Sequence, residues 1–348
     1  MKPAALKQWA KDIAARTVWA YGPDELIARL RRIGVTPGDT LMVHSSWLAH
    51  NGFKGKPADL VRALKRAVGE EGLLVMTSMP YHNMSSSQWL ARGKPMNVLR
   101  SPSMMGLVSE VFRRSENVRR SLSPTHPLLA WGADADAFID GHEHTDRPFG
   151  AASPFARLLE RNALLLGFDA PFDTFTYTHF VEDQLEATLP CALYEPALVD
   201  GVVIDREGRS RVCPVRVLSP EANRLRREAR LIEHLTRSGV LHGGRIGNTR
   251  LRWIRAQDHS RESRRLVEAG AEPGDVTGVV GDRNAEHGVG GVGVRVAAQI
   301  GRLDEVPGRL EGAAQALERP AAAEGAMHHD DRRRGDAHRQ VRPRGRAG

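Results

Sequence analysis

Apolar residues follow two different spacings along the first 255 residues of the chain. Where they recur every three or four positions, they predict amphipathic helices at 24–34, 58–69, 103–115 and 153–162. Short unbroken apolar runs bounded by turn residues predict buried strands at 39–46, 72–80, 128–132 and 163–168. The last helix opens with Ser153 and Pro154, which are typical residues for an N-cap and a first helical position.

Strands that alternate with helices predict an α/β domain over residues 1–255, with a mixed, largely parallel central sheet flanked by helices. In such sheets the ligand site lies beyond the carboxyl ends of the strands. Two of the predicted strands end in polar loops, "HSS" at 44–46 and "TSMPYH" at 77–82. We therefore expect a binding site near these two loops.

The pattern fades after residue 255. No Phe, Tyr or Trp follows Trp253, every lysine lies at or before Lys94, and the rest of the chain is rich in Gly, Ala and Arg. A segment of this kind buries too little apolar surface to offset the entropy of ordering. We expect residues 256–348 to be an atypical, poorly packed tail. It is either a genuine low-complexity segment or the product of a frameshift in a GC-rich gene.

The formal charge of +8 indicates an anionic partner, which leaves nucleic acid, a membrane surface and a phosphate-bearing cofactor open. Residues 256–348 hold 15 Arg against 15 Asp plus Glu, so the excess charge belongs to the first 255 residues. Cys191 and Cys213 fit no metal or disulfide pattern and suggest reduced thiols. The N-terminus is too polar for a signal peptide, and no run reaches the ~18 apolar residues of a membrane span. These features predict a cytoplasmic protein.

The stretch "TYTHFVEDQLE" (176–186) holds the strongest chemical signal. His179 and Glu182 are three residues apart, so on a helix they share a face. A carboxylate there can accept the Nδ1 proton of the imidazole, which leaves Nε2 free to take a proton from a substrate. The spacing is common on solvated helix faces, so by itself it does not distinguish a catalytic pair from two residues on a solvent-exposed helix face.

Several longer stretches narrow the choice, because they occur in a fixed order: "LMVHSSWLAHNGFKGKPADLVRALKRAVGEEGLLVMTS", "RRSLSPTHPLLAWG", "GAASPFARLLERNALLLGF" and "DTFTYTHFVED". Together they resemble the antibiotic N-acetyltransferase family, whose best-known members are aminoglycoside 3-N-acetyltransferases. The resemblance covers roughly residues 20 to 255. It implies acetyl-CoA as the acyl donor, a small-molecule amine as the acceptor, and no metal.

The resemblance also implies roles for single residues. His179 matches the family's general base, and Glu182 matches its partner. The residues that match positions close to coenzyme A are His44, Ser45, Ser46, Arg120, Ser121, His126 and Ser153. The match around Arg120 is imperfect, since Leu128 or Leu129 stands where the family often has Ser. Thr77 and Ser78, after the second strand, are further cofactor-side candidates that could stabilise an oxyanion.

Aminoglycosides are polycations and favour carboxylates. The acidic residues that flank the dyad, and are therefore candidates for binding the acceptor, are Asp169, Asp173, Asp183 and Glu186. The positive body argues mildly against a polycation, so another small amine stays open, as does an inactive member of the family. A polyanion-binding protein that uses the Arg-rich tail is the alternative from another class. We expect no specific nucleic acid and no membrane partner, and we leave a homodimer open.

Other motifs fit their usual contexts poorly. "GVGGVG" (288–293) lacks the strand and helix of a dinucleotide site. "GHEH" (141–144) and "HHDD" (328–331) lack the helical spacing of zinc ligands, and we interpret the former as a solvated loop. "RRRGDAHRQVRPRGR" has no aromatic residue for base stacking.

Overall fold

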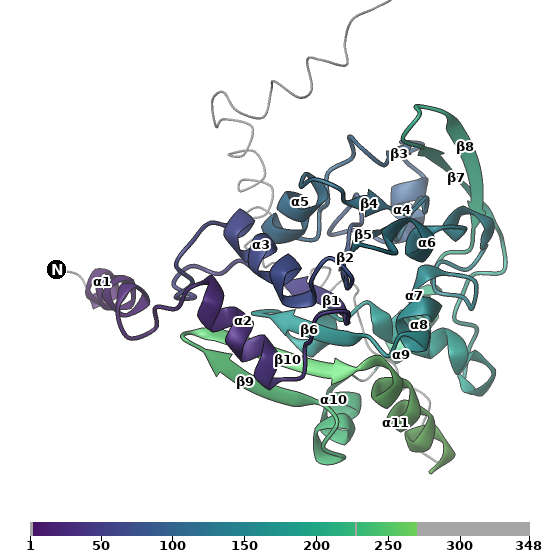
Figure 1. Cartoon of the computed structure of the whole chain (residues 1–348). Coiled ribbons are helices and arrows are strands. Elements are labelled where there is room, and N and C mark those ends of the chain that lie inside the picture. The colour runs from purple at the N-terminus through teal and green to yellow at the C-terminus, as the bar shows by residue number, and fades with distance from the viewer. Residues whose placement is uncertain (1–2, 227, 270–348) are drawn as a thin grey trace, which may run out of the picture. The chain divides into compact units, whose positions relative to one another are not determined.

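The computed structural model describes residues 3–226 and 228–269, in which seven strands form one mixed sheet (Figure 1). The strand order is β4-β5-β2-β1-β6-β10-β9. The bounds are β1 Thr40–Ser45, β2 Leu73–Thr77, β4 Arg119–Arg120, β5 Leu128–Gly132, β6 Leu164–Phe168, β9 His242–Ile246 and β10 Thr249–Arg255.

The three central strands, β2, β1 and β6, run parallel to one another. On either side, β5 and β10 run antiparallel to them, and the edge strands β4 and β9 reverse direction again. Five of the seven strands therefore point the same way. The prediction of an α/β fold with a mixed, largely parallel sheet is confirmed.

Side chains alternate along each central strand and so feed two cores, one on each face of the sheet. Leu41 and Val43 of β1 pack with α2, α3 and α5, whereas Met42 packs with α6, α7, α8 and α10. The helices are α1 Pro3–Arg16, α2 Pro23–Arg32, α3 Pro57–Val68, α4 Ser86–Leu90, α5 Leu107–Arg113, α6 Ala135–Ile139, α7 Pro154–Glu160, α8 Tyr177–Gln184, α9 Pro220–Leu225, α10 Glu228–Arg237 and α11 Ala256–Glu268. Single 3₁₀ turns are η1 His142–His144, η2 Phe172–Thr174 and η3 Glu186–Thr188.

The structure differs from the sequence-based expectation in several details. The helix expected at 103–115 is shorter, because Gly106 has a φ of 122° and α5 starts only after it. A second sheet of three strands was not expected. It has the order β3-β7-β8, with β3 Met96–Asn97, β7 Val199–Ile204 and β8 Ser210–Val215.

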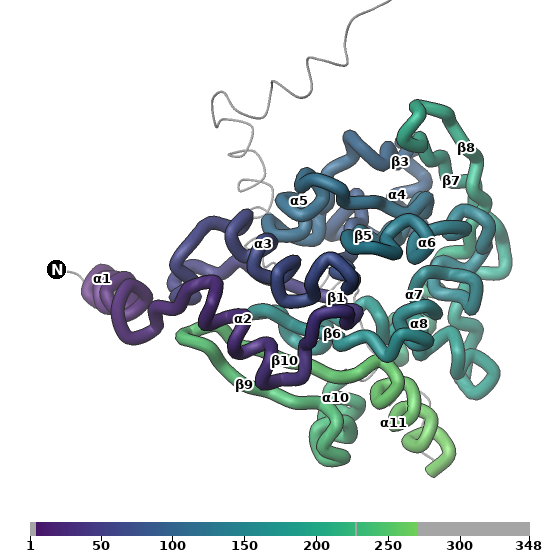
Figure 2. Tube along the Cα trace, viewed as in Figure 1, coloured from purple at the N-terminus to yellow at the C-terminus, as the bar shows by residue number. Residues whose placement is uncertain are grey.

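The packed body extends beyond residue 255, where composition placed its end. Helix α11 lies beside α7, α8 and α10, as the chain trace in Figure 2 shows. The buried residues of α11 are Ala256, His259, Glu262 and Ser263, so this helix packs through small and polar side chains rather than aromatic ones. Composition missed it for that reason. The rest of the predicted tail, with "GVGGVG" and "HHDD", lies outside the described residues.

Within the described part of the chain, no helix has both the length and the apolar character needed to cross a bilayer.

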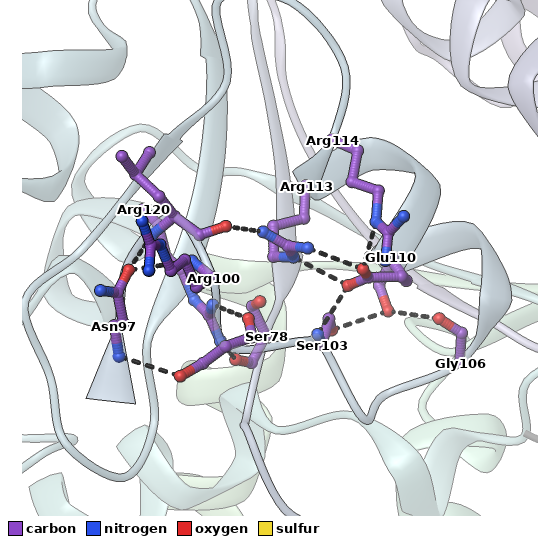
Figure 3. Close-up of polar contacts among 12 residues, drawn as sticks. Ser78, Asn97, Arg100, Ser103, Gly106, Glu110, Arg113, Arg114 and Arg120 are labelled. Atoms are coloured by element: carbon purple, nitrogen blue, oxygen red, sulfur yellow. Dashed lines mark hydrogen bonds and ion pairs between the residues drawn. The ribbon is translucent and has the colours of Figure 1, made fainter. Parts of the chain in front are cut away.

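A buried carboxylate, Glu110 of α5, organises the loop that precedes this helix. It binds Arg113 through two contacts of 2.7 and 2.8 Å, Arg114 at 2.6 Å, and the backbone N–H of Ser103 at 2.7 Å (Figure 3). Burial alone would raise the pKa of Glu110, but Arg113, Ser103 and Arg114 together hold it below the ordinary value of 4.5.

Glu110→Gln should therefore destabilise the fold by about 3 kcal/mol, because it leaves the nearly buried Arg113 without its counter-charge. Urea unfolding at neutral pH measures this difference. The difference should begin to shrink as the pH falls below 4.5, where Glu110 is protonated in the unfolded chain, and it should be lost only below the lower pKa of Glu110 in the folded protein. The exposed Glu70→Gln is the control and should stay within about 0.5 kcal/mol of wild type. Equal stabilities for the two variants would contradict the role of Glu110.

Candidate active site

Helix α8 brings His179 and Glu182 together. The Nδ1 atom of His179 lies 2.8 Å from Oε2 of Glu182, and both side chains are buried, with 2% and 1% of the residue exposed. Their three-residue spacing places them on one helix face, as the sequence predicted. They do not lie on a solvated surface.

A third residue, Arg226, completes this cluster and was not predicted. Its guanidinium donates two hydrogen bonds to the carboxylate of Glu182, from Nε to Oε1 at 2.9 Å and from Nη2 to Oε2 at 2.6 Å. Nη2 also lies 3.3 Å from Nδ1 of His179, and Nη1 donates to the side chain of Asn223. Arg226 follows α9, 44 residues after Glu182, and no motif in its own segment marks it.

Burial and neighbouring charges set the protonation of the cluster. Burial lowers the pKa of His179; Glu182 opposes this effect and Arg226 adds to it. Burial alone would raise the pKa of Glu182, but Arg226 and His179 hold it below its ordinary value. At neutral pH the cluster is therefore a neutral imidazole, an ionised carboxylate and a guanidinium cation.

His179 lines a cavity of about 230 Å³. The other described lining residues come mainly from the loop after β2: Met79, Tyr81, His82, Asn83, Met84, Ser85, Ser86, Met105, His126, Thr176, Leu218 and Asn223. The sequence pointed to this loop as a polar end of a strand. The described hydrogen bonds of His179 side-chain atoms all involve Nδ1, which leaves Nε2 for a group in the cavity. None of the described lining residues is a carboxylate.

His126 is the predicted cofactor-side residue that the structure brings to the same cavity. Its Nε2 lies 3.3 Å from the Tyr81 hydroxyl, and its Nδ1 lies 3.0 Å from Oγ1 of Thr125. The Phe149 ring packs against both His126 and His179, at centroid distances of 4.6 and 4.9 Å. Burial, and then the neighbouring His179, holds the pKa of His126 well below its ordinary value.

The "HSS" loop lies elsewhere. His44 is buried, and its Nε2 accepts the backbone N–H of Thr176 at 3.1 Å while its ring stacks on Phe175. Burial lowers the pKa of His44 to about 3, so this ring stays neutral and acts as an acceptor. Ser45 and Ser46 are half-buried, and Ser46 donates its N–H to the carbonyl of Phe168. None of the three lines the cavity.

Arg120 and Ser78 belong to an internal network (Figure 3). Arg120 is buried and donates to the backbone carbonyls of Ser101, at 2.5 Å, and of Ser78. Thr77 and Ser78 are buried at the end of β2, and the Ser78 hydroxyl has no hydrogen-bond partner among the described residues. Arg120 therefore ties two loops together through their carbonyls and does not reach the cavity.

Ser121 pairs with His142, one of the two histidines of the "GHEH" stretch. The Ser121 hydroxyl lies 2.8 Å from Nδ1 of His142 and accepts the N–H of Leu128 at 2.9 Å, while Nε2 of His142 lies 3.1 Å from the Pro148 carbonyl. His142 is thus a buried structural residue, and the expectation of a solvated loop was wrong for it. His144 is exposed. Among the described residues, no group of three His, Cys, Asp or Glu side chains is placed to hold a metal.

Ser153 occupies the N-cap position of α7, with Pro154 at the first helical position, as predicted. Its side chain makes no capping hydrogen bond, however, and its hydroxyl is buried without a partner among the described residues. Ser153 does not line the cavity.

The four acidic residues that flank the dyad in sequence do not line the cavity either. Arg147 binds both Asp183, at 3.3 Å, and Glu186. Asp169 accepts the backbone N–H of Arg250 at 2.8 Å and so closes the end of β10. Asp173 lies in η2. The expected carboxylate-rich wall is absent from the described lining because Arg147 and the Arg250 backbone hold three of these side chains.

The chain is similar to several known proteins. A family model described as aminoglycoside 3-N-acetyltransferase matches residues 42–268. Aminoglycoside N(3)-acetyltransferase IV of a Salmonella species is 32% identical over 183 residues, which are 52% of this chain and 66% of that enzyme. The aminoglycoside N(3')-acetyltransferase-like protein YokD of Bacillus subtilis is 25% identical over 212 residues, 57% of this chain and 78% of that protein.

Solved structures show the same fold. AAC(3)-IVa in complex with a gentamicin superposes with a TM-score of 0.58 at 26% identity, over 74% of this chain and 96% of that one. AAC-IIIb with CoASH superposes with a TM-score of 0.60 at 21% identity, over 72% of this chain and 98% of that one.

The family match spans more than half of the chain and extends to the last residue of α11, so the helix that composition had assigned to a tail is part of the family domain. The chain belongs to the aminoglycoside 3-N-acetyltransferase family, which is a family of acyltransferases.

Proposed function

We propose that the protein transfers an acetyl group from acetyl-CoA to an amino group, with His179 as general base. The observation that carries this proposal is a buried imidazole whose Nδ1 is held by Glu182 and whose Nε2 is left for the cavity. The 3-amino group of an aminoglycoside is the first candidate acceptor, because the matched relatives are named for this reaction.

His179, Glu182 and Arg226 each have a separate role in this mechanism. An amino group that attacks the thioester carbonyl must lose a proton as the C–N bond forms, and Nε2 of His179 accepts it. Glu182 stabilises the resulting imidazolium through Nδ1–H, and Arg226 keeps Glu182 ionised and fixed in direction. As the C–S bond breaks, the same Nε2 can return its proton to the departing thiolate.

The cavity wall is suited to the pantetheine arm of acetyl-CoA, which supplies the activated acetyl group. Met79, Met84 and Met105 offer flexible apolar surface for its methylene groups, and Asn83 and Ser85 offer partners for its amides. Of the cofactor-side residues, we propose His126 as a cavity contact. At the ends of β1 and β2, Ser45, Ser46, Thr77 and Ser78 remain proposed contacts of the cofactor. By contrast, His44, Arg120 and Ser121 already have hydrogen-bond partners within the protein.

A second candidate acceptor is an amine with few positive charges. The described cavity wall carries neutral polar groups, and the nearby acids are bound by arginines: Glu182 by Arg226, and Asp183 and Glu186 by Arg147. Such a wall binds hydroxyl and single amino groups by hydrogen bonds but gains little from additional ammonium groups. The Arg-rich segment invoked for polyanion binding lies outside the described residues.

Replacing the proposed base tests the function directly. His179→Ala should lower turnover by ~10²–10⁴, the usual contribution of a general base. Free thiol released from acetyl-CoA, with a panel of aminoglycosides and simple amines, measures the rate. An unchanged melting temperature and retained acetyl-CoA binding are the controls. Wild-type turnover in a folded variant would remove His179 from the mechanism.

The role of Glu182 can be tested through the pH dependence of kcat. Glu182 raises the pKa of His179, so Glu182→Gln should lower that pKa and move the acid limb of the profile to lower pH. It should also cut kcat by ~10² or more, because the imidazolium loses its counter-charge. Comparing the two enzymes with one acceptor cancels the titration of the acceptor itself. An acid limb that moves to higher pH contradicts this role of Glu182.

A single new carboxylate distinguishes the two acceptor classes. Ser85 lines the cavity and is the N-cap of α4, accepting the N–H of Gln88. Ser85→Asp keeps the cap and adds a negative charge. It should raise kcat/KM for a polyamine aminoglycoside about fivefold relative to a monoamine, equivalent to about 1 kcal/mol. Ser85→Asn, which also caps but is neutral, should leave the ratio unchanged. Equal ratios for both variants would contradict a neutral wall.

A further inference from the structure

The three residues that precede His179 are each held by a different hydrogen-bond partner. The N–H of Thr176 binds His44, as described above. The Tyr177 hydroxyl lies 3.2 Å from Oγ of Ser260 and 3.3 Å from the Ala256 carbonyl. Oγ1 of Thr178 lies 3.1 Å from Nε2 of His259. Two of these three anchors come from α11, about 80 residues further along the chain.

His259 is built into this contact and is shielded from solvent. It is fully buried, its Nδ1 lies 3.1 Å from Oγ of Ser263, and its ring packs against Phe172 and Tyr177. Burial lowers the pKa of His259 to about 4, so the ring is neutral at neutral pH, with one donor and one acceptor nitrogen. Each nitrogen has a partner, Oγ1 of Thr178 for Nε2 and Oγ of Ser263 for Nδ1.

The hydrogen bonds between α11 and α8 are polar contacts, and such contacts position a helix more precisely than apolar packing does. Apolar surfaces can slide over one another at little cost, whereas hydrogen bonds lose strength steeply with distance and angle. Helix α8 has only eight residues, and its far end is held by the Arg226 clamp on Glu182. The anchors from α11 hold the opposite end, so together they define the rotation of α8 about its axis.

We infer that α11 is a positioning element of the active site, and that His259, through Thr178, sets the direction in which His179 points into the cavity. This inference rests on the proposed function of His179. Neither His259 nor Thr178 lines the cavity, so they act through the base and do not touch the substrate. A misplacement of about 1 Å at the reacting atoms can cost as much as ~10²-fold in rate.

Thr178→Val removes the hydroxyl that His259 binds and keeps the shape of the side chain. We expect kcat to fall about 10-fold or more, with the KM for acetyl-CoA within about twofold of wild type. Thr178→Ser, which restores the hydroxyl, should recover most of the loss. Ser263→Ala is the matched control, because it removes the other hydrogen bond of the same ring, on the side away from α8. It should leave kcat within about twofold of wild type.

A double variant separates positioning from general stability. Thr178→Val combined with His179→Ala should be no slower than His179→Ala alone, since there is no longer a base to position. The inference is overturned if Thr178→Val has wild-type kcat, if it loses no more than Ser263→Ala, or if it lowers turnover by the same factor without His179. If His179→Ala itself keeps wild-type turnover, the proposed function fails, which is a different result.

Discussion

The forked contact between Arg226 and Glu182 is the interaction on which the site depends. Burial by itself would raise the pKa of a carboxyl group and remove its charge, and a neutral Glu182 could not support an imidazolium. The guanidinium supplies the compensating charge with two directional bonds, of 2.9 and 2.6 Å. Glu182 can then remain ionised in the interior and hold the ring of His179 in one orientation. The clamp holds an imidazole and an ionised carboxylate in a buried, fixed arrangement, which is the arrangement that the proposed general base requires.

Helix α8 is short, and the rest of the domain compensates for its length. Its partners come from β1, from the link between α9 and α10, and from α11, at sequence distances of 132, 44 and 81 residues. The dyad is therefore local in sequence, but its geometry is a property of the whole body. Since α11 supplies two of the anchors, the C-terminal part of the family domain contributes to the site without lining it.

The net charge of the chain does not describe the charge of the cavity wall. The +8 of the chain does not appear in the described cavity wall, where the side chains are mostly neutral. Many of the carboxylates nearby are bound to arginines, as in the pairs of Arg147 with Asp183 and of Arg216 with Asp146. Such pairing stabilises loops and takes charge away from the acceptor. In the proposed reaction, recognition of the acceptor rests on shape and hydrogen bonds.

Short-range periodicity was enough to predict the α/β alternation, the buried strands, and the shared helix face of His179 and Glu182. Its ordered motifs also pointed to the family. Contacts between groups far apart in the chain became visible only in the folded molecule. The fold places Arg226 against Glu182, His44 against the backbone N–H of Thr176, and Arg147 against Asp183. It also ordered α11, because hydrogen bonds between distant polar residues leave no periodic apolar pattern in the sequence.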